Sequence, residues 1–167
     1  MSSVLKVDAI QNTGGTTGLT IDNNGFVLPK AIVFSAYKSS DQSLTASTWT
    51  KITFDTEEFD TASFYDTSTS RFQPTTAGYY LITASLAFLS GTGNAVLTRV
   101  YKNGSFFRNA SYHYHSASNL DDVQNYASIL MYLNGTDYVE IYGLGIGLVT
   151  INSGTTYSSF QGHLVGV

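Results

Sequence analysis

The sequence predicts an all-β protein, a sandwich or jelly roll of about eight to ten strands. Three observations support this class. The composition is rich in serine, threonine, tyrosine and glycine, and only 12% of the residues are charged, which is typical of strands rather than helices. Apolar and polar residues alternate with period two between turn sequences. No window of about 12 residues combines helical spacing with good helix formers.

Residues 1–30 differ from the rest of the chain. Two short apolar runs, at 4–7 and 19–21, are joined by glycine- and asparagine-rich turns, and Pro29 marks the expected boundary. The segment has too few apolar residues for a core, so we expect it to dock on its own copies or on another protein. The sequence therefore predicts an attachment segment at 1–30 and a jelly-roll head at 31–167. The candidate attachment residues are Leu5, Val7, Ile10, Leu19 and Ile21.

From residue 31 onward the chain reads as strands and turns. The expected strands span residues 32–37, 49–54, 63–65, 71–72, 79–88, 96–101, 106–108, 126–133, 138–142 and 156–167. Asn103-Gly104 between two apolar runs predicts a tight hairpin, and the turn at Asn134-Gly135 repeats the pattern. The acidic run from Asp55 to Asp60 is expected to be a solvated loop.

The composition excludes several classes of function. The chain has 167 residues and no cysteine, so disulfide scaffolds, thiol catalysis and iron–sulfur clusters are excluded. Eight Lys and Arg residues against twelve acids argue against nucleic-acid binding. No apolar stretch approaches the roughly 20 residues of a membrane span, and the N-terminus has neither a basic leader nor an apolar core, so we expect no secretory signal.

Motifs from residue 31 to the C-terminus resemble, in order, those of one known family. They are Phe64-Tyr65-Asp66, Ala77-Gly78-Tyr79, the segments 100–104 and 133–138, and the Ser-x-Phe-x-Gly pattern at 158–162. Together they resemble the globular head of the first complement component and its tumour-necrosis-factor-like relatives. The resemblance implies a ten-stranded jelly roll that assembles as a homotrimer. Residues 1–30 contain no collagen-like Gly-x-y repeat, in contrast to the stalk of that family.

Residues 5–12 and 19–29 carry a second, shorter resemblance, to segments of tail-fibre and other virion appendage proteins of bacteriophages. It implies a virion protein, made in the host cytoplasm and displayed on the particle surface, whose residues 1–30 contact other virion proteins. A trimeric tail fibre or receptor-binding head and a capsid decoration or head-fibre protein are both compatible with it. A secreted complement-like or lectin-like trimer is a further alternative.

The late strands predict where a trimer would form. Ile129, Met131, Val139 and Ile141 occupy one face of the alternating pattern, and tyrosines occupy the other. In the family these strands lie near the threefold axis, so the resemblance implies that the tyrosine face contacts neighbouring subunits. The candidate interface residues are Tyr126, Tyr132, Tyr138 and Tyr142.

Ligand-binding candidates cluster between residues 112 and 121, with Trp49 as a further aromatic. Tyr112, Tyr114 and Trp49 can stack on sugar rings, which suggests a host surface glycan as a ligand. His113 and His115 lie on the same side of a strand, and three copies can offer six nitrogens to a metal such as iron. A surface strand or loop rich in tyrosine and histidine, without a bound metal, is the favoured interpretation.

Asp121 falls near the position of the calcium-binding aspartate of the complement family. The acidic pair that completes that site is not evident upstream, so a solvated loop is favoured. We therefore predict no metal and no cofactor. The sequence contains no Gly-x-Ser-x-Gly elbow, no phosphate-binding loop and no His-Glu-x-x-His motif, and we predict that the protein is not an enzyme.

Overall fold

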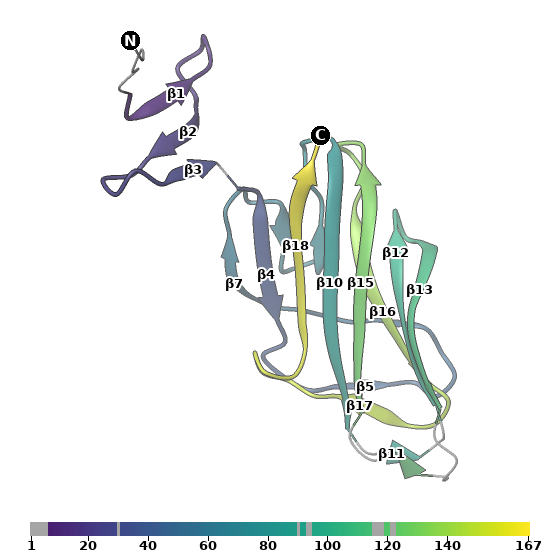
Figure 1. The fold of residues 1–167 in the computed structure, drawn as a ribbon. Helices are drawn as coiled ribbons and strands as arrows, with labels where there is room; N and C mark the ends of the chain where they lie inside the picture. The colour runs from purple at the N-terminus through teal and green to yellow at the C-terminus, as the bar shows by residue number, and fades with distance from the viewer. Residues whose placement is uncertain (1–6, 30, 90, 93–94, 115–118, 121–122) are drawn as a thin grey trace. The chain divides into compact units, whose positions relative to one another are not determined.

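The computed structural model describes residues 7–29, 31–89, 91–92, 95–114, 119–120 and 123–167. These residues form strands, turns and loops, with no helix among them. The chain divides into two compact units, Met1–Ala31 and Ile32–Val167. Each unit is described by itself (Figure 1).

The N-terminal unit is a three-stranded antiparallel meander. Its strands are β1 (Ala9–Gln11), β2 (Thr17–Ile21) and β3 (Val27–Pro29), hydrogen-bonded in that order. The first described strand lies at 9–11, and residues 4–6 of the apolar run at 4–7 fall outside the described residues. Two side chains fix the turns, because Asn12 Oδ1 accepts backbone hydrogen bonds from Gly14 and Thr16, and Asp22 caps the second turn in the same way.

The second unit is a sandwich of two antiparallel sheets, as predicted. In sheet I, the central strand β10 (Gly78–Leu89) pairs along one edge with β15 (Val123–Leu133). Along its other edge it pairs first with β18 (Ser159–Gly166) and then with β17 (Val149–Ile151). The sheet comprises β4 (Val33–Tyr37), β5 (Gln42–Leu44), β7 (Thr56–Asp60), β10 (Gly78–Leu89), β15 (Val123–Leu133), β17 (Val149–Ile151) and β18 (Ser159–Gly166). Figure 1 shows β18, β10 and β15 side by side, in the order β7-β4-β18-β10-β15 across the sheet.

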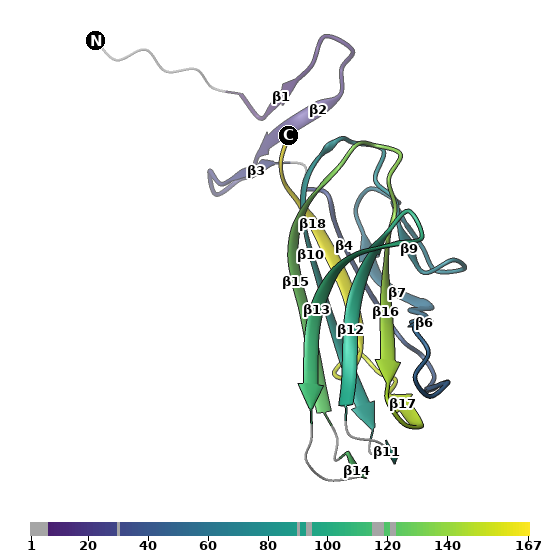
Figure 2. The ribbon, with the colours of Figure 1, turned by 90° about the vertical axis from the view of Figure 1, so that its right-hand side faces the viewer.

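Sheet II has the order β13-β12-β16-β9-β8, with β6 also pairing with β16 (Figure 2). Its strands are β6 (Thr50–Lys51), β8 (Tyr65–Asp66), β9 (Arg71–Phe72), β12 (Ala95–Lys102), β13 (Ser105–Tyr114) and β16 (Val139–Gly145). The short strands β11 (Gly91–Thr92) and β14 (Asn119–Leu120) pair with each other at one end of the sandwich (Figure 2).

The hydrophobic core lies between the two sheets and is rich in aromatic rings. The Phe34 ring stacks on Tyr65 and Phe72, with centroids 4.9 and 4.4 Å apart, and meets Phe160 edge-on at 5.0 Å. The inward residues of β10 predicted from the alternation, from Tyr80 to Phe88, are buried. So are the four aliphatic residues assigned to the core face of the late strands: Ile129, Met131, Val139 and Ile141.

A glycine in β18 makes room for this aromatic cluster. A Cβ atom on Gly162 would lie 2.6 Å from Cε1 of Phe34 and 3.1 Å from Cδ1 of Ile82. Any larger residue would force the Phe34 ring out of its stack, because a core at crystal-like density has no space to absorb an added methyl group. The glycine therefore allows β18 to pass close over the ring.

Local signals predicted some connections correctly and others wrongly. Asn103 and Gly104 have φ angles of 54° and 72° and join β12 to β13 in the expected hairpin. The acidic run is not a loop, because residues 56–60 form β7, which pairs with β4 and has no second partner strand among the described residues. Exposed carboxylates suit such an edge strand, since charge opposes pairing with another chain. In the strand expected at 49–54, β6 covers only Thr50–Lys51, and the Ile52 N–H donates to the carbonyl of Ile141 at 2.9 Å.

Candidate interaction surfaces

The outer face of sheet I carries a patch of exposed apolar side chains on three adjacent strands. We call it the tyrosine patch: Tyr79 on β10, Tyr126, Leu130 and Tyr132 on β15, and Val165 on β18, each between 49 and 64% exposed. The strand register gathers them, since Tyr79 lies opposite Tyr132 and their rings meet edge-on at 5.4 Å. An apolar patch of this kind on one side of a sheet marks an interaction surface.

The four tyrosines predicted for the trimer interface do not form one surface. Tyr126 and Tyr132 belong to the tyrosine patch, but Tyr138 immediately precedes β16 and Tyr142 lies within it, in sheet II. The expectation of a single tyrosine face was wrong because the turn at residues 134–138 crosses from one sheet to the other instead of closing a hairpin. Tyr142 stacks on Tyr101 with centroids 3.8 Å apart, and burial raises its pKa.

The crossing turn is held by side chains from the β12–β13 hairpin. Asn103 donates from Nδ2 to Asp137 Oδ1 at 2.7 Å and accepts from the backbone N–H of Tyr138 at 2.9 Å. Lys102 Nζ lies 2.8 Å from Asp137 Oδ2. Burial alone would raise the pKa of Asp137, but the hydrogen bonds from Lys102, Asn103 and the Asn134 backbone outweigh it and hold that pKa below its usual value.

The outer face of sheet II carries arginines between aromatic rings. The guanidinium carbon of Arg99 lies 3.9 Å from the centroid of the Trp49 ring and 4.5 Å from that of Phe106. Arg71 lies over Tyr138 at 4.1 Å, and its Nε donates to Glu140 at 2.9 Å. Cations held against aromatic faces in this way are fixed in position without being fully withdrawn from water.

A depression of about 360 Å³ opens beside Arg99. Its lining residues are Leu97, Arg99, Asn109, Ala110, Ser111 and Tyr112. A β-bulge shapes it, because Thr98 pairs with Ser111 and Arg99 with Asn109, so that Ala110 is left without an opposite residue. Tyr112, one of the predicted ligand residues, therefore lies next to Arg99, which was not among the residues predicted from the sequence.

The remaining candidate ligand residues are only partly covered by the structure. His113 and Tyr114 lie on β13 and are exposed, while His115 and Asp121 lie outside the described residues. Among the described residues, no group of three histidines, aspartates or glutamates is close enough to hold a metal ion. No described helix is long and apolar enough to cross a membrane.

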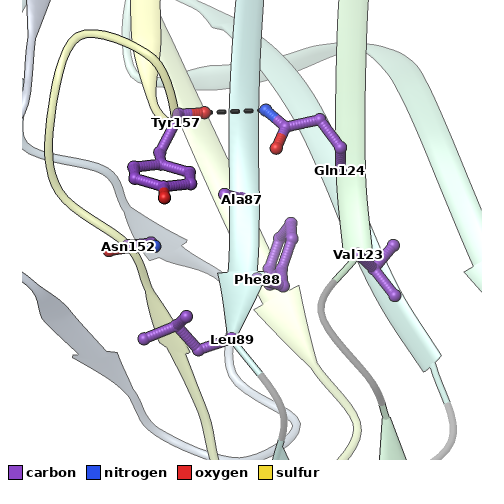
Figure 3. A pocket seen from close by; sticks show the side chains of 7 residues that line it. All are labelled: Ala87, Phe88, Leu89, Val123, Gln124, Asn152 and Tyr157. Carbon is purple, nitrogen blue, oxygen red and sulfur yellow. Dashed lines mark hydrogen bonds between the residues drawn. The ribbon is translucent and has the colours of Figure 1, made fainter.

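A smaller pocket of about 110 Å³ lies where β10 and β15 approach β17 (Figure 3). Its principal polar group is already engaged, since Gln124 Nε2 donates to the backbone carbonyl of Tyr157 at 2.7 Å and also contacts Ser85 Oγ. The other lining residues are mainly apolar: Ala87, Phe88, Leu89, Val123 and Asn152. The pocket is therefore a packing gap at the strand ends with few free polar groups to orient a ligand.

The candidate attachment residues form a stripe along the meander. Ile10 pairs with Leu19, and Ile21 pairs with Val27, so apolar side chains lie opposite one another across adjacent strands. Ile10 and Val27 are each 55% exposed, and none of the described residues of this unit is fully buried. Of the other candidates, Val7 is half-buried and Leu5 lies outside the described residues.

Comparison with solved structures defines the class of the jelly roll. The structure of Eiger, a tumour necrosis factor from S. frugiperda, superposes with a TM-score of 0.64 at 10% identity, covering 82% of this chain and 94% of that one. The globular domain of the zebrafish complement 1qA protein gives 0.59 at 16% identity, with 81% and 97% covered. Murine APRIL gives 0.65 at 8% identity, with 81% and 100% covered. The fold is thus a complement- and tumour-necrosis-factor-like jelly roll.

The sequence family agrees with the fold. The C1q domain model matches residues 33–165, so the chain belongs to the C1q domain family. No curated protein matches the sequence. Domains of this kind form homotrimers and generally act as binding modules rather than as enzymes. The fold by itself does not identify a ligand, which has to be argued from the surfaces described above.

Proposed function

We propose that the protein is the trimeric binding head of a bacteriophage particle, a fibre or receptor-binding protein attached through residues 1–30. The observation that carries the trimer is the tyrosine patch, which lies on the outer face of a sheet whose other face already fills the core. Tyrosine suits a protein interface because its ring buries a large area while its hydroxyl reaches a partner or a trapped water. Tyr126 and Tyr132 are the proposed interface residues.

Attachment through the N-terminal unit is supported by the small size of the unit and its exposed apolar stripe. The unit is a small meander with an exposed apolar stripe and no buried residue among those described. A sheet this small needs an apolar face packed on something for stability. Virion proteins supply that partner in the proposed arrangement, and the sequence resemblance of residues 5–12 and 19–29 to phage appendage proteins supports this choice.

Deletion of residues 1–30 tests the attachment. The truncated protein is expected to remain a folded trimer, since the described core residues all lie beyond residue 31, and to be absent from purified particles. Incorporation at the level of the full-length protein would contradict the attachment role. Immunogold labelling of wild-type particles then separates a tail position from a capsid position, the latter indicating a decoration or head-fibre protein.

A secreted complement-like or lectin-like trimer is the second candidate. The family match supports a secreted role as well as it supports a virion role, because the match covers the jelly roll alone. The similar solved structures include a zebrafish complement protein. Fractionation of the producing culture separates the two. Protein that sediments with particles supports the virion role, whereas free trimer in the medium, with none on particles, supports the secreted role.

A further inference from the structure

The charges of the head are unevenly distributed over its two sheets. Sheet II and its flanks carry all three arginines, together with Lys51 and Lys102. Four carboxylates lie instead on β7 and just before it, at one edge of sheet I: Asp55, Glu57, Glu58 and Asp60. A negatively charged ligand is therefore drawn to sheet II although the chain as a whole is acidic.

Two carboxylates near these bases are already paired with them. Glu140 Oε1 binds Lys51 at 3.2 Å and Arg71 at 2.9 Å, and Asp137 binds Lys102. Among the described residues, Arg99 has no carboxylate within ion-pair distance. Its Nε donates to Asn109 Oδ1 at 2.7 Å, which leaves the terminal guanidinium nitrogens with hydrogen-bond capacity.

The position of Arg99 is fixed in advance of any ligand. The Trp49 and Phe106 rings lie within 4.5 Å of its guanidinium carbon, and the bond to Asn109 orients Nε. A side chain held in this way loses little further entropy when it binds an anion. The depression next to it adds an apolar floor at Leu97 and a phenol at Tyr112, whose side chain is mostly exposed at 62%.

We propose that this depression binds an acidic sugar, a pyranose that bears a carboxylate, as a unit of a surface polysaccharide. The carboxylate pairs with the guanidinium of Arg99, the ring stacks on Tyr112, and sugar hydroxyls bond the amide of Asn109. One cation beside an aromatic ring and an amide fits a carboxylated sugar better than a nucleic acid, which is bound by several phosphate-contacting bases in a row. The inference rests on the proposed binding function and names its ligand.

Binding is measured with the full-length protein by isothermal titration calorimetry. The probes are an oligosaccharide that contains glucuronate and a neutral glucose oligosaccharide of equal length. We expect the acidic probe to bind wild-type protein and the neutral probe to bind at least about tenfold more weakly, because a hydrogen bond to a charged partner contributes about 1.5–3 kcal/mol. Equal binding of both probes, or binding of neither at millimolar concentration, would overturn the proposal.

Matched variants locate the site. Arg99→Gln is expected to weaken binding of the acidic probe at least about tenfold. Arg108→Gln removes the same charge from the neighbouring strand outside the depression, and it is expected to leave that binding unchanged. Tyr112→Ala is expected to weaken binding, while Phe107→Ala, which removes another exposed ring of β13 outside the depression, does not. Equal losses from Arg99→Gln and Arg108→Gln would show a diffuse charge effect and overturn the proposal.

Two further measurements remove ambiguity. Arg99 contacts Trp49, so each variant is checked by thermal melting, and Tyr112→Ala carries the test if Arg99→Gln does not fold. A single-stranded oligonucleotide of matched charge that displaces the acidic sugar would refute the assignment to saccharide. Trimer size and attachment to particles are measured on the same preparations. A protein that is trimeric and attached to particles but does not bind the acidic probe contradicts only this inference and not the proposed function.

Discussion

Tyr132→Asp is expected to dissociate the trimer and to leave the protomer folded. The Tyr132 side chain is 49% exposed and contacts the Tyr79 ring edge-on, outside the core. In an isolated protomer the substitution therefore removes one aromatic contact, about 0.5–1.5 kcal/mol. That loss is small against the roughly 5–15 kcal/mol that stabilises a typical domain.

The effect on assembly is larger. Full burial of a large apolar side chain contributes about 1.5–3 kcal/mol, so covering the exposed half of each residue in the tyrosine patch contributes about 1 kcal/mol. Its five residues then give about 5 kcal/mol per subunit, against which the costs of association must be set. An unpaired carboxylate buried in the same interface costs about 3–5 kcal/mol, which removes most of that gain.

Size-exclusion chromatography with light scattering measures the outcome. The wild-type protein is expected at about three times 18.1 kDa and the variant near 18.1 kDa at micromolar concentration. Ser40→Asp places the same charge on an exposed position and should remain trimeric. A Tyr132→Asp protein that stays trimeric with an unchanged melting temperature would refute the assignment, and dissociation by Tyr112→Asp instead would place the interface on sheet II.

Two further predictions concern stability. Gly162→Ala should lower the free energy of unfolding by about 1–3 kcal/mol, because its methyl group collides with Phe34, while Gly166→Ala, with no atom within 4 Å of the new Cβ, should melt like wild type. Because the pKa of Asp137 is lowered in the folded protein, its contribution to stability is complete above about pH 4 and is lost as the pH falls through that lowered pKa. Asp137→Asn should therefore reduce the free energy of unfolding at neutral pH and make that free energy depend less on pH below about pH 4. An unchanged pH dependence in that acid range, measured by chemical denaturation, would contradict this.

The long strands β10, β12 and β15 were predictable because their signal is local and repeated, whereas β13, with its mostly exposed side chains, was predicted only at residues 106–108. In β10 and β15 alternate residues enter the core over eleven or more positions, so the period-two pattern in the sequence specifies which face is buried. The short strands β5 and β17 pair mainly with each other and were not predicted. Three residues cannot establish an alternation, and their pairing depends on where the rest of the chain places them.

The sequence could not show that the β15–β16 connection crosses between sheets. Asn134 and Gly135 are turn residues in a hairpin and in a crossing alike, so the local signal is the same. The distinction comes from Asn103 and Lys102, more than thirty residues earlier, which bind Asp137. The Arg99 depression was missed for the same reason, because Trp49, Arg99 and Phe106 meet only after β12, β13 and the segment before β6 have come together.

The two proposed surfaces lie on different sheets, which has a consequence for binding strength. One ion pair and one stacked ring support weak binding, and a dissociation constant near 1 mM corresponds to only about 4 kcal/mol. A trimer presents three such sites, so a polymer that engages two of them gains about 10²–10⁴ in apparent affinity without any new contact. Tyr132→Asp leaves the depression intact and should therefore weaken binding of a long acidic polysaccharide by that factor, while a short oligosaccharide binds as before. Surface plasmon resonance with both ligands measures the two effects, and an equal loss for both would mean that the binding site itself is shared between subunits.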